Sequence, residues 1–187
     1  MANKIRRLSR PLDFVDGDDL AALDEAANGS PRAAAIVTTA LVEDALRWCL
    51  CGFLTPDADR AELPALDHAD VFDNEIAPLK TFHAKIVIGY SLGIYGTVTR
   101  DDLQRMKRIR NAFAHSPRSI TFETREVSSE CLGLRYLDTT LANMHKTIEF
   151  DDNNPRQKFL ETARLLILDL HAIGFPKSDK RHLEKML

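Results

Sequence analysis

The 187-residue chain has only three cysteines and no long uninterrupted apolar run, and both scarcities exclude classes of protein. Cys49, Cys51 and Cys131 are odd in number, and the first two lie on one predicted helix, where their side chains point apart. We interpret all three as reduced thiols of a cytoplasmic protein. A small secreted fold held together by disulfides is thereby excluded.

Nothing in the sequence predicts contact with a membrane. The longest apolar stretch, residues 33–54, is interrupted by Glu43, Asp44 and Arg47, so it is too polar to cross a bilayer. The first residues are basic, but the apolar core of a secretory signal does not follow them. We therefore expect a cytoplasmic protein without a membrane partner.

The motifs of common metal and nucleotide sites are missing as well. The six histidines are scattered, and no cysteine or histidine pair has the C-x2-C or H-x3-H spacing of zinc sites. The sequence has no Walker phosphate-binding loop and no G-x-S-x-G nucleophile elbow. We expect neither a metal nor a cofactor.

Apolar residues recur at steps of three and four along most of the chain, which is the spacing of amphipathic helices. We predict an all-α fold, a single-domain helical bundle of about five to seven helices. An N-terminal arm is expected over 1–16, the helical domain over 17–175 and a C-terminal tail over 176–187. The helices are expected near 17–28, 31–53, 78–92, 100–115, 128–135 and 154–171.

Residues of the helix-capping type mark where several helices should begin. Ser30 is a good N-cap and Pro31 suits the first helical position, where its missing N–H has no partner to lose. Asn154 and Pro155 predict the start of the last helix in the same way. Thr99, followed three residues later by Asp102, resembles a capping box and predicts a helix from residue 100.

Other residues mark where helices should end. Gly93 is suited to the position just after the helix over 78–92, because glycine readily takes the left-handed conformation needed there. Pro117 disfavours helical geometry at Ser116, so the helix that starts at residue 100 should end near His115.

Charge is unevenly distributed along the chain. Residues 100–125 hold seven basic and three acidic residues, whereas residues 55–76 hold seven acidic residues and one arginine. A basic segment can bind nucleic acid or another anion; alternatively it pairs with an acidic surface or is simply solvated. The candidate anion- or nucleic-acid-binding residues are Lys85, Arg105, Arg108 and Arg110. For Lys85 the alternative is a stem that covers apolar surface while the ammonium stays in water.

The end of the basic helix carries an unusual group, Arg110-Asn111 followed by His115. Arginine suits phosphate recognition and histidine suits proton transfer, so the pair could cleave RNA, with Asn111 in a positioning role. Five residues place the two side chains about 140° apart around a helix, so a symmetric dimer would be needed to bring two such pairs into one cleft. In the structural alternative, Arg110 pairs with Glu43 or Asp44.

The spacing of Arg110 and His115 resembles the R-x4–6-H signature of the HEPN superfamily, all-α domains that include RNA-cleaving toxins. Pro117 stands where toxins of one subtype often have tyrosine. Over roughly residues 30–170 the chain also resembles the mannitol operon repressor (MltR-type) family. The residues that carry this second resemblance are Leu41-Val42-Glu43, Pro78-Leu79, Phe82, Lys85-Ile86, Tyr90, Leu92-Gly93-Ile94, Asp102-Leu103, Ile109-Arg110-Asn111, Phe113-Ala114-His115, Phe122 and Cys131.

These resemblances lead to two hypotheses of different kinds. In the first, the chain is a non-enzymatic, cytoplasmic, transcription-regulator-like helical protein. It forms a homodimer and acts through a regulatory protein partner, with weak nucleic-acid contacts as an addition. In the second, the chain is a metal-independent ribonuclease of HEPN type that uses Arg110, Asn111 and His115. A third hypothesis is a helical module that binds an unrelated partner.

Overall fold

Helices and short connections account for the whole of the chain that the computed structural model describes, which is residues 17–54, 69–144, 151 and 153–174. This confirms the all-α prediction. The predicted arm over 1–16 and tail over 176–187 lie outside the described residues. The elements are α2 (Gly17–Asn28), α3 (Pro31–Leu54), the short π-helix η1 (Ala69–Asp73), α4 (Phe82–Ser91), α5 (Thr97–His115), α6 (Arg125–Leu132), α7 (Tyr136–Met144) and α8 (Pro155–Gly174).

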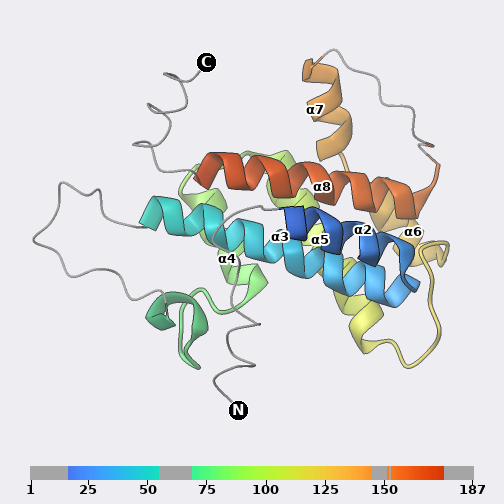
Figure 1. Ribbon diagram of the computed structural model, residues 1–187, viewed down its shortest axis with the longest axis horizontal. Helices are drawn as coiled ribbons and strands as arrows, with labels where there is room; N and C mark the ends of the chain where they lie inside the picture. Colours follow the sequence, from blue (N-terminus) through green and yellow to red (C-terminus); the bar gives the residue numbers. More distant parts are fainter. Residues whose placement is uncertain (1–16, 55–68, 145–150, 152, 175–187) are drawn as a thin grey trace, which may run out of the picture.

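The two longest helices, α3 and α8, lie side by side and run in the same direction (Figure 1). At one end, the Arg156 guanidinium donates to the carbonyl oxygens of Ala27 and Gly29, over 2.7 and 2.6 Å. At the other end, Gly174 packs directly on α3 at Gly52, where a Cβ on either glycine would collide with the backbone of the other helix. Small residues therefore permit a close approach that larger ones would prevent.

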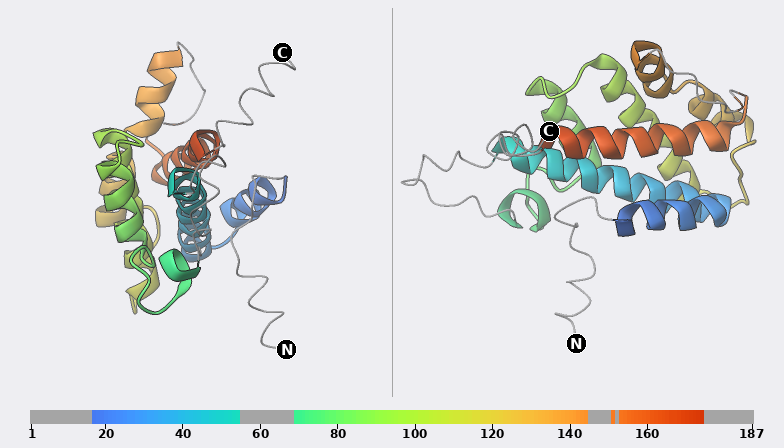
Figure 2. Two further views of the ribbon diagram at one scale, coloured as in Figure 1. Left: turned by 90° about the vertical axis from the view of Figure 1, so that its left-hand side faces the viewer. Right: turned by 45° about the horizontal axis from the view of Figure 1, so that its top comes forward.

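The remaining helices form layers on either side of this central pair. Figure 2 shows α2 on one side of α3, and α4 and α5 on the other. Apolar residues surround α3 almost completely, as is typical of a helix in the middle of a bundle. The buried residues of α3 are Ala34, Ala35, Thr38, Thr39, Val42, Ala45, Leu46, Cys49 and Leu50.

Several predicted helix ends are confirmed. The Ser30 hydroxyl accepts from the N–H of Ala33 over 3.2 Å, and α3 starts at Pro31 as expected. Gly93 has φ of 69° just after α4, in the left-handed region that favours glycine. The α5 helix ends at His115, and Ser116 is extended (φ −67°, ψ 123°), as its position before Pro117 predicts.

Other predicted boundaries are wrong. The α4 helix begins at Phe82, not near residue 78, because the Thr81 hydroxyl caps it by accepting from the N–H of Ala84 over 3.1 Å. The α6 helix covers Arg125–Leu132, about three residues earlier than expected, and α7 was not predicted as a separate helix. Within the acidic segment before residue 76, the described residues include one helical turn, η1.

The prediction that Thr99 and Asp102 start a helix is also wrong. The α5 helix starts at Thr97, so Thr99 is already inside it, and Asp102 is fully buried. One carboxylate oxygen of Asp102 accepts from the backbone N–H groups of Arg135 and Tyr136, over 2.8 and 2.7 Å. Asp102 thus supplies an N-terminal cap for a different helix, α7, at the cost of burying a charge.

The buried carboxyl of Asp102 predicts a specific pH dependence of stability. Burial raises the pKa of Asp102 even though two N–H groups favour its charged form. The folded state therefore holds the proton more tightly than the unfolded state, so this group's contribution to stability falls as pH rises between the two pKa values. We expect Asp102→Asn, which keeps an acceptor oxygen, to gain stability relative to the wild type as pH rises from about 4 to 7.

Urea unfolding of both proteins at several pH values tests this prediction. Asp102→Ala serves as the comparison, because it removes the cap as well as the charge and should cost about 1 kcal/mol or more at every pH. A stability difference between wild type and Asp102→Asn that does not change with pH would contradict it.

Candidate functional site

The basic helix α5 is built around one apolar face. Leu103, Met106, Ile109 and Phe113 are all buried, as their spacing predicted. This face packs α5 against α3, with α4 along one flank and α6 along the other. The charged residues of α5 are therefore divided between two flanks and an outer surface, and each group has different partners.

On the α6 flank, the guanidinium groups of Arg105 and Arg108 both bind Glu130. Arg105 donates to one Glu130 oxygen over 2.8 Å, and Arg108 donates to both oxygens over 2.9 Å. Hydrogen bonds from Arg108 lower the pKa of Glu130, so the carboxylate stays ionised. Two candidate anion-binding residues are thus already paired with an internal anion.

Lys85 is also paired inside the chain. Its ammonium lies 2.5 Å from a Glu43 carboxylate oxygen and 3.3 Å from the Lys80 carbonyl oxygen, and the residue is only 5% exposed. The expectation that the ammonium stays in water is therefore wrong. This pair also occupies Glu43, which was one of the two predicted partners of Arg110.

Arg110 and His115 are both exposed, and α5 does not bring them together. Arg110 donates to the Asn111 side-chain oxygen over 3.1 Å, while His115 is the last residue of the helix. Within the described residues, neither side chain contacts a carboxylate. The guanidinium and imidazole are thus open to solvent on different sides of one helix, and the chain by itself does not focus them on one phosphate.

On the α4 flank, side chains of α4 and α5 contact one another, and we call this side of the two helices the α4–α5 face. Its six residues are His83, Val87 and Tyr90 of α4 and Arg100, Gln104 and Lys107 of α5. His83 Nδ1 accepts from Gln104 over 3.2 Å and faces the Lys107 ammonium at 3.4 Å, and the Arg100 guanidinium lies 4.5 Å from the centre of the Tyr90 ring. These contacts join the two helices near both ends of the face.

The α4–α5 face exposes apolar side chains in its middle. Val87 is 48% exposed and Tyr90 is 36% exposed. Tyr90 follows Ile86 by four residues, a spacing that fits a core stripe, but its ring lies outside the core and packs under Arg100. The spacing of His83, Val87 and Tyr90 at steps of four and three could have indicated a second, exposed stripe on the same helix.

The described residues lack two further features. They contain no group of three or more His, Cys, Asp or Glu side chains placed to hold a metal ion. They also contain no helix with the length and apolar character needed to span a membrane.

The pairing with Glu130 leads to a prediction about nucleic-acid binding. Glu130→Gln should release Arg105 and Arg108, and each phosphate they then contact should steepen the salt dependence of binding by about 0.7–0.9 in log–log slope. Fluorescence anisotropy with labelled RNA and DNA at several salt concentrations measures this. Glu126→Gln, an exposed neighbour on α6, is the matched control. Equal affinities and slopes for both variants would show that Glu130 does not limit binding.

The fold resembles one that has been solved. A chain in the X-ray structure of the MtlR–HPr complex from Escherichia coli matches with a TM-score of 0.61, over 83% of this chain and 99% of that chain, at 15% identity. No family model and no curated protein matches the sequence. At this identity the match shows the fold alone, and it confirms that the chain has an MtlR-like helical fold.

Proposed function

We propose that this chain is a non-enzymatic, regulator-like helical protein that acts by binding a regulatory protein partner. The observation that carries the proposal is the state of the basic helix. Its cations on the α6 flank are bound to Glu130, while the opposite flank exposes Val87 and Tyr90 beside Arg100. Exposed aromatic and apolar residues next to arginine are typical of protein interfaces.

The comparison with known structures supports the same class of function. The chain with the matching fold comes from a complex of MtlR with HPr, which is a complex between two proteins. An HPr protein is therefore a reasonable first partner to titrate against this chain. The homodimer expected from the sequence remains a prediction, as do contacts with nucleic acid.

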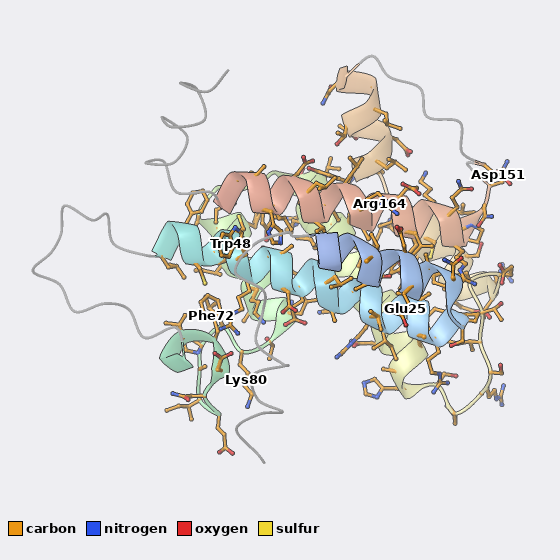
Figure 3. The ribbon with its side chains drawn as sticks, in the orientation of Figure 1. Glu25, Trp48, Phe72, Lys80, Asp151 and Arg164 are labelled. Atoms are coloured by element: carbon orange, nitrogen blue, oxygen red, sulfur yellow. The ribbon has the colours of Figure 1, made fainter. Side chains whose placement is uncertain are left out.

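A photo-crosslinking residue placed at Val87 in cells tests the proposal. We expect a discrete adduct with a protein, and we expect it to weaken when Tyr90→Ala is added, because central aromatic residues contribute strongly to interfaces. The control position is Glu25, which is exposed on α2 on the opposite side of α3 (Figure 3). If the adducts at Val87 and Glu25 were the same, or if Val87 captured no protein, the proposal would be wrong.

The ribonuclease alternative is favoured by one observation, the exposure of both Arg110 and His115. We expect wild type, Arg110→Ala and His115→Ala to be equally inactive on a labelled structured RNA and to permit equal growth when expressed. Both substituted positions are exposed, so the variants should keep their fold. Cleavage by the wild type that both substitutions abolish would overturn the non-enzymatic proposal in favour of this alternative.

A further inference from the structure

We infer that the α4–α5 face binds an acidic protein surface on which carboxylates flank a protruding apolar side chain. The inference rests on the proposed function and specifies the chemistry of the partner. Three observations carry it: cations that contact no carboxylate of the described residues, an exposed apolar centre, and a rigid support beneath both.

The first observation concerns the cations at one end of the face. Lys107 contacts His83, and Arg110, one turn further along α5, contacts Asn111. Neither of these cations contacts a carboxylate of the described residues, in contrast to Lys85, Arg105 and Arg108. A partner that supplies carboxylates at this position would provide charges that the described residues do not.

The second observation concerns the centre of the face. Val87 lies between the Lys107 end of the face and Tyr90, whose ring lies under Arg100. Burying exposed side chains of this kind against a partner favours binding. The Arg100 guanidinium over the Tyr90 ring also lies beside Asp101, at 2.7 Å, so this end of the face is close to neutral. The charge preference of the face therefore comes from the Lys107 end.

The third observation is that the residues beneath the face are fixed. Ile86 is fully buried, and the Tyr95 hydroxyl donates to the Ile86 carbonyl oxygen over 2.9 Å. Tyr95 also packs against Gly89 so closely that a Cβ at this position would overlap its ring. Because α4 is held in this way against the chain that follows it, Val87 and Tyr90 keep their relative positions. A preorganised surface binds at a lower entropic cost.

The same observations favour a protein over a nucleic acid. A phosphate backbone gains little from covering Val87 and Tyr90, and two cations without a carboxylate partner among the described residues would release counterions at only about two phosphates. Acidic side chains can approach Lys107 and Arg110 while an apolar neighbour packs on Val87. An acidic protein surface meets both requirements at once.

The probes for a binding test are two synthetic helical peptides of about four turns with leucine along one face. One carries glutamate beside the leucines and the other carries glutamine, and an oligouridine RNA is the third probe. We expect the glutamate peptide to bind the full chain about tenfold more tightly than the glutamine peptide, and to perturb the NMR signals of Val87 and Tyr90. Raising the salt concentration should weaken this preference.

Charge-reversal variants locate the binding on the chain. Lys107→Glu combined with Arg110→Glu should remove the preference for the glutamate peptide, whereas Arg125→Glu, an exposed reversal on α6, should leave it unchanged. Circular dichroism melting confirms that each variant is folded. Equal binding of the two peptides, no binding of either, or binding of the RNA alone would overturn the inference.

The inference and the proposed function can fail separately. Suppose that the protein adduct at Val87 in cells is unchanged in the double variant Lys107→Glu, Arg110→Glu. A protein partner then exists but does not use carboxylates at these cations. In that case the proposed function stands and the inference does not. If Val87 captures no protein, both are wrong.

Discussion

The close contact between α3 and α8 at Gly52 and Gly174 is the constraint on which the arrangement of the other helices depends. Neither position has room for a Cβ, so the two backbones approach more closely than bulky side chains would allow. At the other end of the pair, Arg156 holds the chain just before α3. With both ends fixed, α3 offers one side to α2 and another to α4 and α5 (Figure 2).

A few internal carboxylates then determine which cations the protein presents to solvent. Glu130 engages Arg105 and Arg108, and Glu43 engages Lys85 from the neighbouring helix. The partly exposed pairs with Glu130 contribute only about 0–1 kcal/mol each to stability. Their effect on recognition is larger, because an incoming phosphate would have to displace a carboxylate that is already hydrogen-bonded. The surface of α5 therefore presents fewer unpaired positive charges than its sequence suggests.

The sequence predicted those features that depend on local patterns. The all-α class, the caps at Ser30 and Asn154, and the end of α5 before Pro117 follow from residues within a few positions of each other, and the structure confirms them. Local rules also supplied a plausible capping box at Thr99, but the partners of Asp102 are 33 and 34 residues away. A carboxylate that caps a distant helix has no signature at short spacing.

The candidate site was predictable only in part for the same reason. The exposure of Arg110 and His115 is expected near the end of a helix. The pairing of Lys85 and Arg105, in contrast, depends on carboxylates 42 and 25 residues away in the sequence. Hydropathy could not show whether the Tyr90 side chain is buried or exposed. A tyrosine four residues after Ile86 can lie in the core or at the border between the core and the solvent-exposed side of the helix. Its position became apparent only from Arg100, which lies on the next helix.

The geometry of α5 also explains why the two functional hypotheses make different demands on the same helix. Phosphate cleavage needs a cation and a proton-transfer group at one point, and a five-residue separation on a regular helix turns Arg110 and His115 away from each other. A docking surface needs residues along one side instead, and Arg100, Gln104 and Lys107 have that spacing. The α4 helix, packed along the same side, adds Val87 and Tyr90 between the charges. A regular helix at this position therefore favours recognition over catalysis within one chain.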